Sequence, residues 1–147
     1  MHKVYLRSRI LFCFFQGCHV RHPDIYKLSV SKRDFVIDFF YEYANSATTA
    51  QLACPFFSST DPLKILTQAG CRRIQLLVGL CEATSPVALQ IAKSLPDAQV
   101  RFFDDEAFHA KFYILGQNAL VGSANLTGAG LKSNRESEPR LPMLAAA

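Results

Sequence analysis

Apolar and polar positions follow two different periods along the middle of the chain. Short, dense apolar runs with strand-like length and composition alternate with stretches of helical length and spacing. The strands are predicted at 50–56, 73–80 and 98–103, and the helices at 62–69 and 86–95, with a further core-facing helix in DFVIDFFYEYANSA, residues 34–47. Strands that alternate with helices predict an α/β fold with a mixed, largely parallel sheet flanked by helices.

Two of these helices carry recognisable ends. Asp61 and Ser85 each precede a proline, an arrangement in which the polar side chain caps the helix and the proline takes the first helical position. Gly70 follows the helix at 62–69, where glycine favours a C-terminal stop. We therefore expect both helices to begin at these Asp-Pro and Ser-Pro pairs.

The segment FHAKFYIL, residues 108–115, has the alternation of a strand. Its even positions are apolar, so His109 and Lys111 are predicted to share the opposite face. A second short strand then leads to Ser123 and Asn125. A hairpin with a three-residue loop centred on Gln117 would set Lys111 opposite Ser123 and His109 opposite Asn125, which predicts one patch of four polar groups.

The predicted patch combines an imidazole, an ammonium, a hydroxyl and a carboxamide. It offers one potential nucleophile surrounded by donors suited to phosphoryl oxygens. Preplaced Lys111 and Asn125 would stabilise the negative charge that develops during attack on phosphorus. This arrangement predicts phosphodiester chemistry that requires no metal and no cofactor.

These residues resemble the phospholipase D superfamily, whose motif reads HxKx4D followed by GSxN. The resemblance runs from about Ala50 to Glu136 and is closest to the endonuclease-like and helicase-joined members. It implies that His109 attacks phosphorus to form a phosphohistidine, that a second motif histidine protonates the leaving group, and that Lys111 and Asn125 bind the phosphate.

Two further residues have roles for which an alternative stays open. Ser123 is a candidate phosphate ligand or a turn residue that closes the strand. Glu136 stands where the family has a glutamate that orients the catalytic histidine, with Glu138 as the substitute, although an ordinary solvated acid is the alternative.

The chain departs from the family pattern in three ways. It carries one motif, whereas the family builds each site from two, so the resemblance implies a homodimer with both His109 side chains facing across the interface. Gly116 stands in place of the motif aspartate, which removes a supporting carboxylate. Pro139 and Pro142 interrupt any strand where family members continue, which leaves open a C-terminally truncated domain.

Composition and charge set the domain organisation. The hydrophobic fraction of 50% suffices for one core, and the formal charge of +4 arises from residues 1–33. We predict a basic N-terminal segment at 1–31 whose structure the pattern does not define, a phospholipase D-like domain at 32–138 and a disordered tail at 139–147. No apolar run approaches the roughly 20 residues of a membrane span, and five cysteines indicate reduced thiols in the cytoplasm.

The sequence therefore predicts a cytoplasmic phosphodiesterase hydrolase, specifically a metal-independent nuclease that acts on nucleic acid, with DNA favoured. The first alternative is a nucleic-acid-binding module that has lost turnover and uses the basic N-terminal segment for salt-sensitive attachment. The second is a fragment of a restriction or helicase protein. A phospholipase is the less favoured reading, because lipid-acting members usually carry two motifs or membrane segments.

Overall fold

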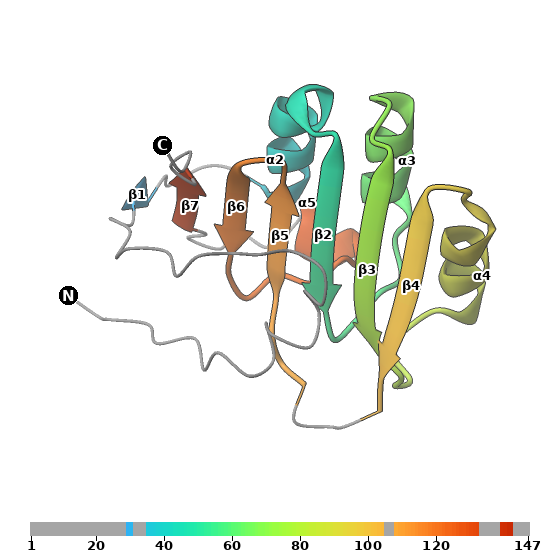
Figure 1. Cartoon of the computed structure of the whole chain (residues 1–147). Helices are drawn as coiled ribbons and strands as arrows, with labels where there is room; N and C mark the ends of the chain where they lie inside the picture. Colours follow the sequence, from blue (N-terminus) through green and yellow to red (C-terminus); the bar gives the residue numbers. More distant parts are fainter. Residues whose placement is uncertain (1–28, 31–34, 105–107, 133–138, 143–147) are drawn as a thin grey trace.

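A seven-stranded sheet forms the centre of the computed structural model, which describes residues 29–30, 35–104, 108–132 and 139–142 (Figure 1). Its strands are β1 (Ser29–Val30), β2 (Thr49–Cys54), β3 (Arg73–Gly79), β4 (Ala98–Phe103), β5 (Phe112–Leu115), β6 (Asn118–Val121) and β7 (Pro139–Pro142). The helices are α2 (Val36–Tyr43), α3 (Asp61–Gln68), α4 (Pro86–Ser94) and α5 (Gly128–Lys132), with a 3-10 turn η1 at Ala44–Ser46.

The strand order is β1-β7-β6-β5-β2-β3-β4. Strands β2, β3 and β4 run parallel, since α3 and α4 provide the crossovers between them, and the remaining neighbours are antiparallel. The predicted α/β class with a mixed sheet flanked by helices is confirmed. The parallel pairs are confined to β2–β3–β4, because the hairpin strands add to the sheet in antiparallel orientation.

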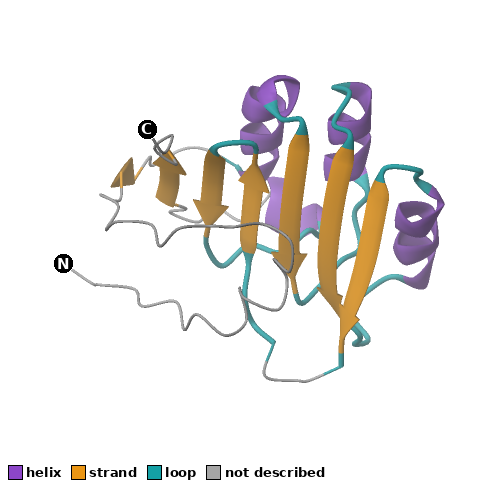
Figure 2. Ribbon diagram, in the orientation of Figure 1, coloured by secondary structure: helices purple, strands orange, loops and turns teal. Residues whose placement is uncertain are grey.

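The described helices all pack against the same face of the sheet (Figure 2). Alternate strand residues such as Leu52, Leu76 and Tyr113 are fully buried on this helix-facing side, where they meet Phe39 and Phe40 of α2. Such alternation is what a strand with one face toward the core requires. The elements predicted at 50–56, 62–69, 73–80, 86–95 and 98–103 therefore occupy their predicted places, with ends that differ by at most two residues. The strand predicted over 108–115 begins only at Phe112, so His109 and Lys111 precede β5 and strand alternation does not set the faces of their side chains.

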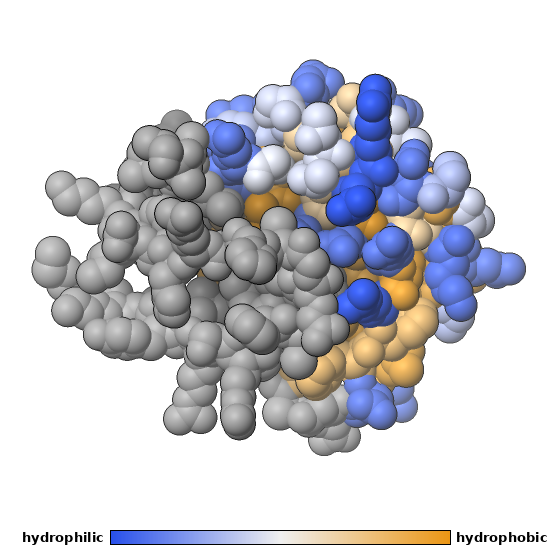
Figure 3. Space-filling view, viewed as in Figure 1, coloured by the Kyte–Doolittle hydropathy of each residue, from blue (hydrophilic) through white to orange (hydrophobic). Residues whose placement is uncertain are grey.

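The opposite face of the sheet carries a smaller cluster of buried side chains, Ala53, Leu77, Phe108 and Phe112. Further along the same strands this face is polar, and Gln51 donates a side-chain hydrogen bond of 3.2 Å to Gln75. Figure 3 shows this division, with mostly hydrophilic side chains over the upper part of the described surface and apolar ones below. The face is thus apolar only near the carboxyl ends of β2 and β3.

Two of the three predicted helix ends are confirmed. The Ser85 hydroxyl accepts a hydrogen bond of 3.3 Å from the Ala88 amide and caps α4. Gly70 has φ +80° after the end of α3. The cap predicted at Asp61 is wrong, because Asp61 is the first residue of α3 and its carboxylate instead accepts a hydrogen bond of 2.9 Å from Lys132 of α5.

The Asp61–Lys132 ion pair predicts a pH-dependent contribution to stability. The hydrogen bond from Lys132 is the main cause that lowers the pKa of Asp61 below its ordinary value. The stabilisation by this ion pair is therefore present above the unfolded-state pKa of Asp61, roughly 3.9. It is lost as the pH falls through the folded-state pKa of Asp61. We expect Asp61→Asn to lower the melting temperature by about 1–4 °C at pH 7 and by much less at pH 3.

Thermal melts followed by circular dichroism at both pH values test this pair. Lys132→Ala should reproduce the loss, whereas Lys64→Ala should have a smaller effect, because its ammonium lies 3.8 Å from Asp61 rather than 2.9 Å. Equal destabilisation at pH 3 and pH 7 would contradict an origin in this ion pair.

The β5–β6 hairpin has a register one residue different from the predicted one. Leu115 pairs with Asn118, so the loop contains two residues rather than three. Gly116 takes φ +58° at the first loop position, a conformation that a type II′ turn requires and that glycine adopts without strain. The predicted pairing of Lys111 with Ser123 and of His109 with Asn125 is therefore wrong.

Strand β7 lies inside the segment 139–147 that the sequence predicts as a disordered tail. Its backbone pairs with β6 and β1, although prolines occur at positions 139 and 142. These prolines stand at the two ends of the strand, where a missing amide donor is best tolerated. The predicted interruption of any strand by these prolines does not occur.

Candidate active site

The candidate site lies where β2 ends and β5 begins (Figure 1). Lys111 precedes β5 directly, and its carbonyl accepts a hydrogen bond of 3.2 Å from the Gly122 amide, which extends the hairpin pairing by one step. Across the sheet, Ala53 pairs with Phe112, so the next pair in this register would be Cys54 and Lys111. The backbone thereby fixes Lys111 at the carboxyl end of β2.

The Lys111 ammonium folds back onto its own segment. Its Nζ donates a hydrogen bond of 3.0 Å to the His109 carbonyl. Burial raises the pKa of the Cys54 thiol to about 12, although the hydrogen bond with the Leu126 backbone and the positive charge of Lys111 both act to lower it. An ammonium has three donors, so this single hydrogen bond leaves donors for a phosphate.

His109 is exposed to solvent two residues before Lys111. Its backbone is already tied to the site through the hydrogen bond that its carbonyl accepts from Lys111. An exposed imidazole is accessible to an anionic ester from solvent, as a nucleophile at phosphorus has to be.

Asn125 reaches the same end of β2 from the other motif segment. Its Oδ1 accepts a hydrogen bond of 3.3 Å from the Phe56 amide, two residues beyond Cys54. Because a backbone amide can only donate, this hydrogen bond fixes the orientation of the carboxamide and turns Nδ2 away from Phe56. Two N–H donors are thereby available for an anionic oxygen.

The segment 55–59 connects Asn125 to the rest of the fold. The amides of Ser58 and Ser59 both donate to the Leu126 carbonyl at 3.0 Å, and Phe57 forms a parallel bridge with Leu126. On its other side, the buried Thr84 hydroxyl accepts from the Phe57 amide at 3.4 Å and lies 2.8 Å from the Gly79 carbonyl. Segment 55–59 is thus held from both sides.

The residues before and after Asn125 are fixed as well. The Tyr113 hydroxyl donates a hydrogen bond of 2.6 Å to the Ala124 carbonyl. Gly130 of α5 approaches the Asn125 backbone so closely that an added Cβ would contact the Asn125 carbonyl oxygen and lie 2.9 Å from its nitrogen. The position of Asn125 therefore depends on a strand, a loop and a helix together.

The backbone places Lys111 and Asn125 at the same end of β2, with His109 two residues before Lys111, although by a different route from the predicted one. Strand β6 ends at Val121, so strand alternation does not position Ser123 or Asn125. Ser123 is exposed on the same turn, where it makes an interaction of its own. Glu136 and Glu138 lie outside the described residues.

Sequence reasoning missed the Phe56 amide and the Thr84 hydroxyl. A backbone donor leaves no signature in residue type, so the Phe56 amide could not be found from sequence. Thr84 is the buried polar side chain of the described core, and its only signal is its place beside Ser85 and Pro86 at a helix start. Of the described cysteines, all free thiols, Cys54 and Cys71 are buried and Cys81 is exposed.

Nowhere in the described residues do three His, Cys, Asp or Glu side chains come together as a group that could hold a metal ion. None of the described helices has the length and apolar character needed to cross a membrane.

Comparison with known proteins shows the family. The model of the family described as cardiolipin synthase, PLD-like domain, matches residues 42–139, so this chain belongs to the phospholipase D-like family. This membership confirms the predicted enzyme class, a phosphodiesterase hydrolase of the phospholipase D type. A search of curated proteins finds no significant match.

Solved structures share the fold at low sequence identity. NucT from Helicobacter pylori is 15% identical with a TM-score of 0.63, over 80% of this chain and 86% of that one. The phospholipase D family member Nuc from Salmonella typhimurium is 18% identical with a TM-score of 0.61, over 82% and 84% of the two chains. These similarities confirm the fold.

Proposed function

We propose that this protein is a metal-independent nuclease that hydrolyses phosphodiester bonds of nucleic acid, with DNA favoured, through a phosphohistidine at His109. The observation that carries this proposal is that the backbone places Lys111 and Asn125 at the carboxyl end of β2, with the exposed His109 two residues before Lys111. Membership of the phospholipase D-like family and the sequence resemblance to its endonuclease-like branch support it.

The proposed reaction has two displacements at phosphorus. The His109 imidazole attacks with a nitrogen lone pair, a P–N bond forms, and the P–O bond to the leaving group breaks as a second histidine donates a proton to that oxygen. Water then attacks phosphorus, loses its proton to this second histidine, and the P–N bond breaks. The Lys111 ammonium and the Asn125 Nδ2 would stabilise the negative oxygens in both steps.

The second histidine is His109 of the partner subunit in this proposal. The described residues include no histidine besides His109, and the sequence contains one HxK motif. A homodimer that apposes two copies of the site would supply both the nucleophile and the acid. We assign the phosphodiesterase domain to residues 32–138, to whose sheet the flanking strands β7 and β1 add one edge, and we place the protein in the cytoplasm as part of the same proposal.

The test is hydrolysis by the purified full chain in EDTA, which silences contaminating metal-dependent nucleases. We expect release of p-nitrophenolate from bis(p-nitrophenyl) phosphate and cleavage of single-stranded DNA, with a specific activity that rises with protein concentration as the dimer forms. Sedimentation velocity at the same concentrations measures the dimer.

Other outcomes would replace the proposal. A folded protein that binds DNA but cleaves no phosphodiester would be the binding module instead. Hydrolysis of phosphatidylglycerol in preference to DNA would show that the substrate is a lipid. The matched family, cardiolipin synthase, PLD-like domain, is named for an enzyme of lipid chemistry.

A further inference from the structure

An open cleft lies next to the candidate site, at the carboxyl end of β3 and the start of α4. Its volume is about 410 Å³, and it is lined by Leu80, Cys81, Glu82, Thr84, Pro86 and Leu89. None of these residues belongs to the motif residues His109, Lys111, Ser123 and Asn125. We refer to it as the β3–α4 cleft.

Thr84 connects this cleft to the phosphate-binding Asn125. Its Oγ1 accepts from the Phe57 amide at 3.4 Å, and the preceding amide, of Phe56, donates to Asn125 Oδ1 at 3.3 Å. Consecutive backbone nitrogens are roughly 3.6 Å apart at most, so the two side-chain oxygens lie within about 10 Å of each other. A ribose and its base can cover this distance from a phosphate held by Asn125.

The lining of the β3–α4 cleft suits a flat, apolar group that carries hydrogen-bond donors at its edge. Leu80 is 54% exposed and Leu89 half-buried, so both offer apolar surface, to which Pro86 adds a rigid ring. Glu82 is exposed and supplies carboxylate oxygens, which can only accept hydrogen bonds when ionised. Cytosine and adenine present an apolar face and an exocyclic amino donor, and carboxylates commonly accept from such amino groups.

We propose that the β3–α4 cleft binds the base of the nucleoside adjacent to the scissile phosphate and prefers bases with an exocyclic amino group. This inference rests on the proposed function and adds a substrate preference to it. Leu80 and Leu89 provide apolar contact with the base, and Glu82 selects the amino group. The acyl chain of a lipid is disfavoured in this cleft, because the Glu82 carboxylate would lose hydrogen bonds to water without gaining a hydrogen-bond donor from the chain.

The experiment compares three esters that release the same p-nitrophenolate. They are the p-nitrophenyl 5′-phosphate esters of thymidine and deoxycytidine, and methyl p-nitrophenyl phosphate, which has no base. For the full-length protein we expect the KM to decrease in the order methyl, thymidine, deoxycytidine. Leu80→Ser should raise the KM for both nucleoside esters about fivefold or more and leave the methyl ester unchanged.

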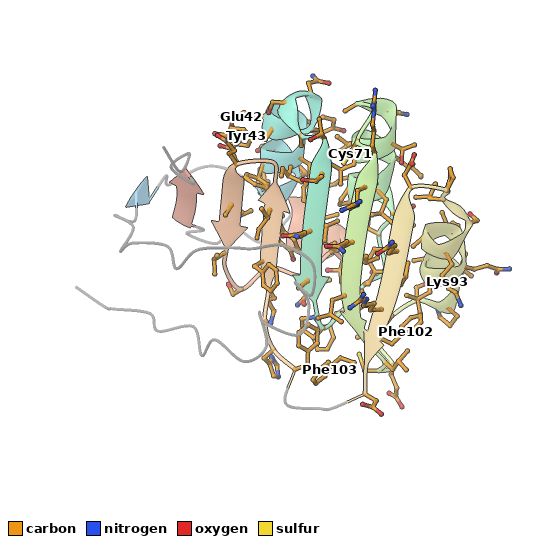
Figure 4. The ribbon with its side chains drawn as sticks, in the orientation of Figure 1. Glu42, Tyr43, Cys71, Lys93, Phe102 and Phe103 are labelled. Atoms are coloured by element: carbon orange, nitrogen blue, oxygen red, sulfur yellow. The ribbon has the colours of Figure 1, made fainter. Side chains whose placement is uncertain are left out.

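One further variant separates the two parts of the proposal, and two others serve as controls. Glu82→Ala should remove the preference for deoxycytidine over thymidine and leave the methyl ester unchanged. Val87→Ser is the matched control, since Val87 is 65% exposed on α4 but does not line the cleft. Phe102→Ala is a second control, because its ring centroid lies 5.8 Å from Lys93 Nζ and its side chain does not line the cleft (Figure 4).

Several results would overturn this proposal. Leu80→Ser and Val87→Ser could have equal effects, all three esters could have the same KM, or the loss could extend to the methyl ester. Each would show that the β3–α4 cleft does not hold a base.

Failure of the proposed function has a different signature, because the wild-type protein would then hydrolyse none of the three esters. In that case NMR titration with deoxycytidine monophosphate tests the cleft alone. Shifts of the Leu80 and Glu82 amides that the Val87→Ser variant retains would support the base subsite. Shifts with dihexanoyl phosphatidylglycerol but not with the nucleotide would overturn it.

Discussion

The variant His109→Ala is expected to lose phosphodiester hydrolysis by about 10³-fold or more. The reason is that the proposed mechanism passes through a bond between phosphorus and the His109 imidazole, and the described residues offer no other histidine. The imidazole is exposed, so its removal should leave the melting temperature unchanged within about 2 °C. Initial rates with bis(p-nitrophenyl) phosphate in EDTA, together with a thermal melt, measure both quantities.

Lysine variants provide the control for this result. Lys111→Ala should lower kcat by about 10²-fold, because in the proposed mechanism its ammonium stabilises the developing charge. Lys93→Ala removes an exposed lysine on α4 and should retain full activity. Hydrolysis by His109→Ala at the wild-type rate would rule out the phosphohistidine.

The second large effect is expected for Gly130→Ala. In an ordinary helix this change stabilises the protein by roughly 0.5–1 kcal/mol, because alanine has the higher helix propensity. Here the new Cβ would meet the Asn125 backbone, which must shift. The shift would weaken the 3.3 Å hydrogen bond that orients the Asn125 carboxamide. We expect kcat to fall by at least about tenfold and the melting temperature to fall as well.

Gly128→Ala is the matched control on the same helix. A Cβ at Gly128 meets no atom within 4 Å, so this variant should keep its activity and melt at the same or a slightly higher temperature. Full activity of Gly130→Ala would show that the contact between α5 and the Asn125 backbone does not control the site. Equal losses of activity and of melting temperature in both variants would indicate that α5 is sensitive to any glycine replacement, and not specifically to the contact with the Asn125 backbone.

The elements that carry the site could be predicted from sequence because each depends on local pattern. The strand β4 has the predicted bounds, and the Ser85 cap and the Gly70 stop are short-range features that residue type alone determines. The candidate residues His109 and Lys111 follow from the HxK spacing, which needs no knowledge of the three-dimensional structure.

The position of Asn125 could not be derived in the same way. The prediction relied on a hairpin register, and a single residue less in the loop reverses the face on which every later side chain falls. Asn125 nevertheless reaches the end of β2, because the chain leaves β6 after Val121. Asn125 then hydrogen-bonds the Phe56 amide and Leu126 forms a bridge with Phe57. These are contacts between distant segments, which no local pattern encodes.

The hydrogen bond between Phe56 and Asn125 also determines when the site can assemble as the chain folds. It joins residues 69 positions apart, whereas the hairpin that carries both motif segments closes over only a two-residue turn. Contacts of low sequence separation form early and those of high separation form late, because of the entropy of loop closure. A nascent chain can thus hold the two motif segments side by side before the Asn125 carboxamide has a fixed orientation. Productive geometry arises only once β2 has joined the sheet, so activity would report on completion of the long-range fold.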